Sequence, residues 1–170
     1  MILNASVVAG LSLLIVLVSM LGELLLSRAH ERALRRRGAV EPPDEAYQKM
    51  RWAYPGVFVV MAIEGALWGP APGSLAVTGA LLFVASKAFK FWAIATLGWR
   101  WTFRVLVPPD GPLVTRGPYA LMRHPNYVAV VGEIVAVALL VGARVSGPLC
   151  LLLFAVLLRR RVRAEERALY

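Results

Sequence analysis

The stretch ILNASVVAGLSLLIVLVSMLGELLL, residues 2–26, decides the fold because it is apolar almost throughout, with Glu23 as its one charged residue. It is longer than the roughly 20 residues with which a helix crosses the hydrocarbon core of a bilayer. No basic residue precedes it and no small-residue cleavage site follows it. We therefore interpret it as a retained transmembrane helix and not as a secretory signal peptide.

Four further apolar segments follow this first one, at about residues 54–68, 74–96, 127–141 and 145–158. The second, fourth and fifth segments are short for a span of about 17–25 residues, which leaves room for bilayer thinning or re-entrant insertion. The connectors 69–73 and 142–148 are rich in glycine and proline and predict tight turns between antiparallel helices. A basic interfacial helix is expected to begin near Ser27, and residues 41–45 predict the loop that breaks it.

Composition agrees with a membrane protein. Of the 170 residues, 59% are hydrophobic and 17% are charged, whereas an ordinary soluble chain has about 25% charged residues. The mean hydropathy of +0.65 fits neither a soluble globule nor a disordered chain. We predict one all-α integral membrane domain with five transmembrane helices.

The basic residues predict the orientation of the helices. The formal net charge is +9, which would suit nucleic acid only if the basic residues shared a folded face. Instead they alternate with the apolar segments, and eighteen of the nineteen fall on one predicted side of the membrane, with Arg144 on the other. By the positive-inside rule that side is the cytoplasm, so the N-terminus lies outside and the C-terminus inside. We expect no nucleic-acid partner.

Metal and disulfide chemistry are not expected. Cys150 is the only cysteine and stands in an apolar run, which favours a small buried hydrophobe. The only histidines are His30 and His124, so a His/Cys zinc site is improbable.

The segment between the third and fourth apolar stretches is too long for a simple hairpin. It ends in RGPYALMRHPNY, residues 116–127. Pro125 suits the first position of a helix, where its missing N–H costs nothing. Such a helix directs free N–H groups and a positive dipole end toward Arg123 and His124, which favours a pocket for a carboxylate or phosphate. The alternative is an interfacial stop signal with snorkelling arginines.

The closing run RRRVRAEER, residues 159–167, extends the fifth helix. Arg161 and Glu165 stand at i,i+4, which is typical of a solvated, self-paired helix. The adjacent carboxylates Glu165 and Glu166 fit equally well as partners for the hydroxyl or ammonium groups of a ligand.

Three carboxylates fall within apolar segments, namely Glu23, Glu64 and Glu133. An ionisable group inside a span is costly and indicates a functional site by default. Glu23 is near the cytoplasmic end and Glu64 near the outer end, where solvent or structural pairing suffices. Glu133 follows Pro125 by about two helical turns, and its side chain points back toward the same pocket.

Three motifs resemble the isoprenylcysteine carboxyl methyltransferase family: GPY at 117–119, RHPNY at 123–127 and RAEERAL at 163–169. The resemblance covers roughly residues 89–169, and phospholipid N-methyltransferases share a related C-terminal pattern. These are membrane enzymes that use S-adenosylmethionine and release S-adenosylhomocysteine.

Two further stretches, RRRGAVE at 35–41 and FWAIATLG at 91–98, resemble a short bacterial branch of this family. Members of that branch are often associated with type III polyketide synthases and O-methylate alkylpyrones. The isoprenylcysteine enzymes continue past the glutamate pair with an aromatic-rich tail, whereas this chain stops at Tyr170, which favours the short branch. The resemblance implies a bacterial inner membrane location with the active site facing the cytoplasm.

The resemblance also implies a cofactor site. His124, with Pro125 and Asn126 at the helix start, would hold the methionine carboxylate, and Glu165 or Glu166 the ribose hydroxyls or ammonium. Tyr119 and Tyr127 would border the sulfonium, whose positive charge suits an aromatic face. Glu133 is included as a cofactor-binding candidate.

Methyl transfer from a sulfonium is an in-line displacement, so positioning and water exclusion dominate catalysis. An enolic pyrone hydroxyl attacks as its anion, and Arg123 or Arg104 would stabilise that anion beside Tyr127. Residues 1–96 would then form a three-helix part and residues 97–170 the catalytic part of one domain.

The leading hypothesis is an S-adenosylmethionine-dependent O-methyltransferase whose lipophilic acceptor enters from the bilayer, among membrane lipids. The nearest alternative changes the acceptor to an isoprenylcysteine carboxylate or another lipid. A non-catalytic lipid-binding or transport protein is a third interpretation, although no inverted repeat is visible.

Overall fold

Five α-helices form the fold in the computed structural model, which describes residues 4–43, 45–69, 71–109 and 113–169. They are α1 (Ala5–Arg36), α2 (Glu45–Trp68), α3 (Gly73–Leu97), α4 (Pro125–Val141) and α5 (Ser146–Leu169), with short 3₁₀ helices η1 (Gly98–Arg100) and η2 (Gly117–Ala120). The all-α class with five helices is confirmed. Residues 2 and 3 of the first predicted span, Asp44 of the predicted loop and Pro70 of the predicted turn lie outside the described residues.

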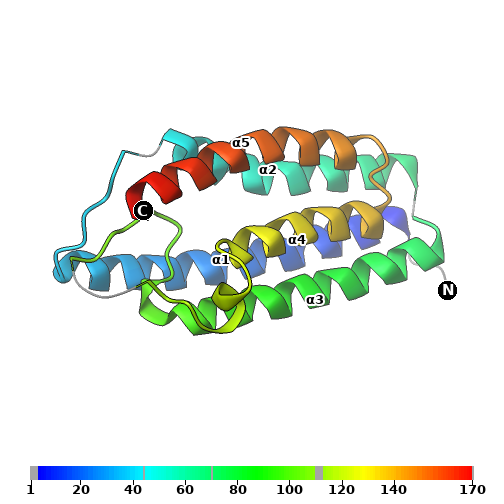
Figure 1. Ribbon diagram of the computed structural model, residues 1–170. Coiled ribbons are helices and arrows are strands. Elements are labelled where there is room, and N and C mark those ends of the chain that lie inside the picture. Colours follow the sequence, from blue (N-terminus) through cyan, green and yellow to red (C-terminus); the bar gives the residue numbers. More distant parts are fainter. Residues whose placement is uncertain (1–3, 44, 70, 110–112, 170) are drawn as a thin grey trace.

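The helices lie side by side as an elongated bundle in which successive helices run in opposite directions (Figure 1). The C-terminal ends of α1, α3 and α5 therefore meet the N-terminal ends of α2 and α4 at one end of the bundle (Figure 1). The described parts of the segment between α3 and α4, residues 98–109 and 113–124, also lie toward this end. All the motifs that were singled out in the sequence are consequently gathered there.

The helices differ in how well they suit a membrane. The spans Ala5–Arg36 and Gly73–Arg100 are long and apolar enough to cross a bilayer, and Pro125–Val141 is a shorter apolar helix. Large apolar side chains along α1, such as Leu14, Ile15 and Val18, are exposed. Outward-facing leucine and valine suit contact with lipid chains, in which no hydrophobic penalty applies.

Several helix boundaries differ from the prediction. α1 continues without a break from the apolar stretch to Arg36, so the basic segment after Ser27 is its last part and not a separate interfacial helix. α2 begins at Glu45, well before its apolar segment. α5 ends at Leu169 and so includes residues 159–167, which confirms the predicted extension of the fifth helix. The reason is that backbone hydrogen bonds extend a helix through polar turns, whereas hydropathy marks only the apolar part.

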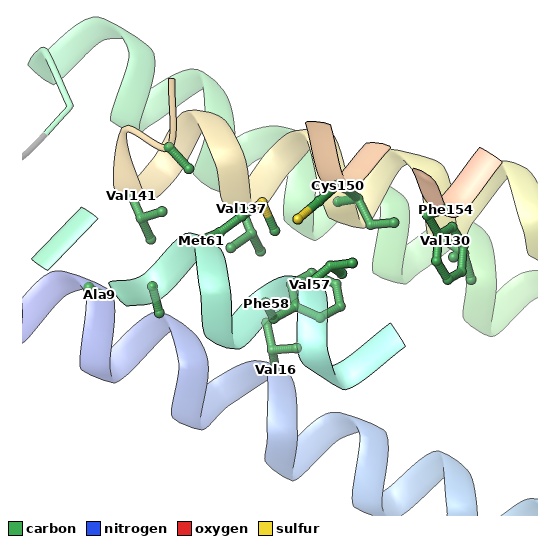
Figure 2. Close-up of a cluster of buried hydrophobic side chains, with 13 residues drawn as sticks. Ala9, Val16, Val57, Phe58, Met61, Val130, Val137, Val141, Cys150 and Phe154 are labelled. Carbon is green, nitrogen blue, oxygen red and sulfur yellow. The ribbon is translucent and has the colours of Figure 1, made fainter. Parts of the chain in front are cut away.

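The apolar core is formed mainly by α1, α2, α4 and α5. Side chains of α2 lie between α1 on one side and α4 with α5 on the other (Figure 2). Phe58, Met61 and Ile134 are completely buried, and Phe154 of α5 closes the cluster. Within a bilayer these side chains stabilise the bundle mainly through close van der Waals packing, because lipid chains are as apolar as the core.

Glycines let α3 and α4 pack closely. A Cβ atom on Gly79 would come within 2.6 Å of the Leu140 backbone nitrogen and 2.7 Å of the Ala136 carbonyl oxygen. A Cβ atom on Gly132 would collide with the hydroxyl of Ser86. Small residues at such contacts allow helix backbones to approach, as is common between membrane helices.

Candidate functional site

The approach to α4 is set by local backbone chemistry. Gly117 has φ +58°, and a Cβ atom there would lie 2.7 Å from Oγ1 of Thr96, so a larger residue would be both strained and crowded. The short η2 helix follows and bears Tyr119. α4 then begins at Pro125 with His124 at its N-cap, which confirms the predicted helix start.

The start of α4 and the end of α5 meet at this point. Nε2 of His124 lies 3.4 Å from Oε1 of Glu166, and Nδ1 lies 3.6 Å from Oε2 of Glu165. The hydroxyl of Tyr127 donates a hydrogen bond of 2.7 Å to Oε2 of Glu165. The His124 and Tyr127 rings stack with centroids 5.6 Å apart. We call His124, Tyr127, Glu165 and Glu166 the polar cluster.

Three other predicted residues border the polar cluster. Arg123 lies 3.7 Å from Oε1 of Glu166, with 68% of its side chain exposed. Burial raises the pKa of the Tyr119 phenol, and the nearby Glu165 carboxylate raises it further, so Tyr119 is a neutral neighbour at physiological pH. Oδ1 of Asn126 is buried and has no hydrogen-bond partner among the residues that the structure describes. Leaving a buried amide oxygen without a hydrogen bond costs free energy, so a donor from outside the described chain is expected to bind there.

Arg161 joins the cluster from α5. Its Nε donates a 3.1 Å hydrogen bond to the Tyr127 hydroxyl, and its side chain also donates to the carbonyl oxygen of Phe103. Sequence analysis placed Arg161 only as an i,i+4 partner of Glu165. Its contact with the segment between α3 and α4 depends on tertiary structure, so spacing alone did not reveal it.

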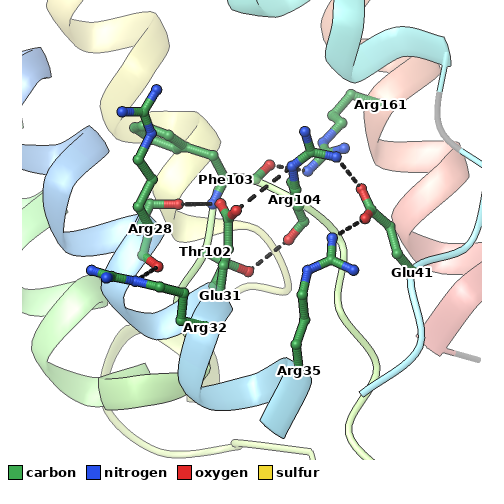
Figure 3. A network of polar contacts seen from close by, with 10 residues as sticks. Arg28, Glu31, Arg32, Arg35, Glu41, Thr102, Phe103, Arg104 and Arg161 are labelled. Atoms are coloured by element: carbon green, nitrogen blue, oxygen red, sulfur yellow. Dashed lines mark hydrogen bonds and ion pairs between the residues drawn. The ribbon is translucent and has the colours of Figure 1, made fainter. Parts of the chain in front are cut away.

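Arg104 lies in a separate network at the same end of the bundle (Figure 3). Its Nη1 is 2.6 Å from Oε1 of Glu41, and its Nε is 3.6 Å from Oε2 of Glu31. Arg35 also pairs with Glu41. Burial tends to raise the pKa of the Glu41 carboxyl, but hydrogen bonds from Arg104 and Arg35 outweigh it and hold this pKa below its ordinary value. The charge of Arg104 is therefore already balanced within the fold.

The network also fastens the chain around Phe103. The hydroxyl of Ser27 in α1 accepts a 2.8 Å hydrogen bond from the Phe103 N–H and donates one of 2.7 Å to Glu31. Val40 and Val107 form an antiparallel bridge with hydrogen bonds of 3.0 and 2.9 Å. The segment between α3 and α4 is thus held to α1 and to the loop before α2.

Glu133 does not reach the polar cluster but joins a second group of charges inside the bundle. Lys87 lies 2.8 Å from Glu23 and 3.0 Å from Glu133, and Lys90 pairs with the same two carboxylates at the same distances. Tyr54 donates a 2.8 Å hydrogen bond to Glu133. We call Glu23, Lys87, Lys90 and Glu133 the ion cluster. It joins α1, α3 and α4 and has no net formal charge.

The two lysines of the ion cluster were counted in sequence analysis only as topology signals. Their i,i+3 spacing puts them on one face of α3, but nothing local predicts a carboxylate partner more than sixty residues away. Glu64 has a structural role, since its two oxygens accept from the N–H groups of Val145 at 2.9 Å and Ser146 at 2.6 Å, at the start of α5.

The polar cluster offers two kinds of binding group side by side. The positive dipole end of α4, with His124 at its N-cap, favours a carboxylate. Glu165 and Glu166 favour hydroxyl or ammonium groups. A small molecule with a carboxylate at one end and hydroxyl or cationic groups at the other would match both.

Comparison with known proteins agrees with this arrangement. Residues 79–170 match the sequence profile of the isoprenylcysteine carboxyl methyltransferase (ICMT) family. The chain belongs to this family. The matched region contains α4, α5 and the segment before them, and so the whole polar cluster.

Two curated bacterial proteins are similar over most of their length. The uncharacterized protein YpbQ of Bacillus subtilis (strain 168) is 33% identical over 155 residues, which cover 91% of this chain and 92% of that protein. An uncharacterized protein of Haemophilus influenzae is 23% identical over 147 residues, 86% of each chain. No solved structure matches significantly. Methyltransferases of this family use S-adenosylmethionine, and membership suggests a membrane methyltransferase.

Proposed function

We propose that the protein is an integral-membrane methyltransferase that uses S-adenosylmethionine to O-methylate a lipophilic acceptor. The observation that supports this most is the meeting of His124 and Tyr127 with Glu165 and Glu166. Beside them lies an Asn126 amide oxygen with no hydrogen-bond partner in the described part of the chain. Each of these residues lies in a motif of the ICMT family.

The residues present fit the cofactor. His124 and the positive dipole end of α4 would hold its methionine carboxylate. Glu165 and Glu166 would accept from the ribose hydroxyls and the ammonium. The Asn126 amide would find its missing partner in the same molecule, and Tyr119 and Tyr127 would present aromatic faces to the sulfonium.

Bound S-adenosylmethionine supplies an electrophilic methyl group, and the chain supplies position and electrostatics. Arg123 is exposed beside the cluster and suits the anion of the acceptor. We assign this role to Arg123 and not to Arg104, because Arg123 borders the polar cluster, whereas Arg104 lies in a separate network with Glu41 and Glu31. Glu133 is likewise left out of the cofactor set, because it is paired inside the ion cluster.

For the acceptor we propose an alkylpyrone-type polyketide. Its enolic hydroxyl is acidic enough to react as the anion, so no dedicated general base is required. Its alkyl chain would enter between helices from the bilayer. The main alternative acceptor is an isoprenylcysteine carboxylate, which is also lipophilic and anionic. In either case the basic end of the bundle would face the cytoplasm, as the positive-inside rule predicts, in a bacterial inner membrane.

Calorimetry in detergent tests the cofactor site directly. We expect the purified protein to bind S-adenosylhomocysteine, and His124→Ala and Glu166→Ala each to weaken binding about tenfold or more, since a hydrogen bond to a charged group contributes about 1.5–3 kcal/mol. Arg160→Ala is the control, because Arg160 is exposed on the same helix. No binding by the wild-type protein, or equal weakening in all three variants, would contradict the proposal.

The acceptor requires a separate experiment. Membranes that contain the protein would be incubated with methyl-labelled cofactor and either an alkylpyrone or a farnesylcysteine. We expect label in the alkylpyrone product and loss of that label with Arg123→Ala. Label only in the farnesylcysteine ester would support the alternative acceptor, and cofactor binding without label in either would reject both.

A further inference from the structure

Arg161 differs from the other arginines of its run. Its residue is 5% exposed, whereas Arg159, Arg160 and Arg163 are exposed. Burying a guanidinium costs several kcal/mol unless its donors are well used. The contacts that offset this cost therefore show which parts of the chain the Arg161 side chain connects.

Those contacts come from three other parts of the chain. Nε donates to the Tyr127 hydroxyl of α4 at 3.1 Å, and Nη2 donates to the Phe103 carbonyl oxygen. The guanidinium also lies over the Tyr47 ring of α2, 5.5 Å from its centroid. Arg161 and Phe103 are close together beside the arginine–glutamate network (Figure 3).

The Phe103 peptide is held on both sides. Its N–H donates to Ser27 of α1 and its carbonyl accepts from Arg161 of α5. One planar fork therefore ties the segment between α3 and α4 to the helix that bears Glu165 and Glu166. A lysine has a single nitrogen on a flexible stem and lacks this fixed geometry.

The contact with Tyr127 also determines where the phenolic proton points. A tyrosine hydroxyl has one proton, and this one goes to Glu165 at 2.7 Å. Arg161 only donates, so its N–H occupies the acceptor side of the same oxygen. The hydroxyl is thereby prevented from accepting from elsewhere, and the Glu165 carboxylate is held in one orientation one helical turn from Arg161.

We propose that Arg161 is a positioning residue of the cofactor site. It acts through Tyr127, holding Tyr127 and Glu165 in the orientation that the cofactor requires and fixing them to the backbone at Phe103. This inference rests on the proposed function, because the ligand in question is S-adenosylmethionine or S-adenosylhomocysteine. Arg161 itself contacts neither the cofactor nor the acceptor in this role.

A double-mutant cycle on the full-length protein in detergent distinguishes this role from a purely structural one. Binding of S-adenosylhomocysteine would be measured for wild type, Arg161→Lys, Tyr127→Phe and the double variant, with Arg160→Lys as the control. We expect Arg161→Lys to raise Kd about tenfold, in the range of a lost charge-assisted hydrogen bond. In the Tyr127→Phe background the same change should raise Kd less than about threefold, because the residue through which it acts is already altered. Arg160→Lys should leave Kd unchanged.

The possible failures are distinguishable. If the wild type does not bind S-adenosylhomocysteine, the proposed function fails and this assignment fails with it. If the wild type binds and Arg161→Lys binds equally well, or if the two effects multiply fully in the double variant, only the positioning role is overturned. If Arg161→Lys does not fold, Arg161→Gln replaces it with the same expectation. Unfolding of both variants would place Arg161 in the fold alone and overturn the assignment.

Discussion

Replacing Lys90 with methionine removes one of the four charges of the ion cluster. Lys90 is 2% exposed and Glu133 is completely buried, so solvent cannot replace the lost partner. Glu23 and Glu133 would then share Lys87 alone, and the cluster would have a net charge of −1. The variant should unfold at a much lower temperature than the wild type.

The size of the effect follows from the contacts. Lys90 makes two ion pairs, at 2.8 and 3.0 Å. At an effective dielectric constant of about 20, each is worth roughly 5–6 kcal/mol before desolvation, and desolvation of the ions offsets most of this. Removal of one partner from a buried ion pair costs about 3–5 kcal/mol. For a chain of this length that corresponds to a fall of about 6–20 °C in the unfolding midpoint.

The charge-balanced double variant is the sharper comparison. Glu133→Gln alone leaves the cluster with a net charge of +1 and should cost a similar amount. Lys90→Met with Glu133→Gln restores neutrality, and the amide still offers an acceptor to the Tyr54 hydroxyl. Because the uncompensated charge is gone, the double variant should be no less stable than either single variant.

Cys150 provides the assay. It is the only cysteine and is 8% exposed, so a thiol-reactive fluorophore would report its exposure as the protein unfolds in detergent. Lys49→Met is the matched control, because Lys49 is exposed on α2. Single variants that unfold within about 3 °C of the wild type, or a double variant whose loss equals the sum of the single losses, would refute the charge-balance reasoning.

Two further predictions concern the arginine–glutamate network and the helix contact. Because the pKa of Glu41 is lowered in the folded protein, its carboxylate stabilises the fold above the ordinary pKa of 4.5, and this contribution is lost as the pH falls through the folded value. Glu41→Gln should therefore lower the unfolding midpoint by about 2–5 °C at pH 7, and the difference from the wild type should vanish well below pH 4. A difference that stays constant with pH would show that the Glu41 carboxylate charge is not its cause. Gly79→Ala should destabilise the fold by about 1–3 kcal/mol, because its Cβ would overlap the backbone of α4. Gly10→Ala should leave stability unchanged or raise it, because its Cβ would meet no packing neighbour within 4 Å. Equal unfolding midpoints for the two variants would contradict the close packing of α3 and α4.

Local chemistry explains which parts of the fold could be predicted. Pro125 tolerates few positions in a helix, and it is indeed the first residue of α4. The apolar runs also located the five helices, because each helix must present an apolar surface to the core or to lipid. The end of α1 and the start of α2 were less predictable, because their polar turns continue the backbone hydrogen bonding beyond the apolar part.

The candidate site was predictable where its motifs are local and unpredictable where partners come from distant helices. His124 and Glu166 were both singled out, and the structure brings them within 3.4 Å. Arg104 and Glu133 were assigned to the same site, but each has partners elsewhere that are more than forty residues away along the chain. Spacing along one helix gives a shared face, but it does not say which of several carboxylates a buried cation will meet.

The central claim is that the start of α4 and the end of α5 together hold the methyl donor. Ultraviolet cross-linking of labelled S-adenosylmethionine to the purified protein, followed by peptide mapping, tests it most directly. We predict label in peptides that contain residues 119–127 or 161–167, with competition by S-adenosylhomocysteine and loss of label in His124→Ala. Label confined to other parts of the chain, or label that S-adenosylhomocysteine does not displace, would contradict the claim.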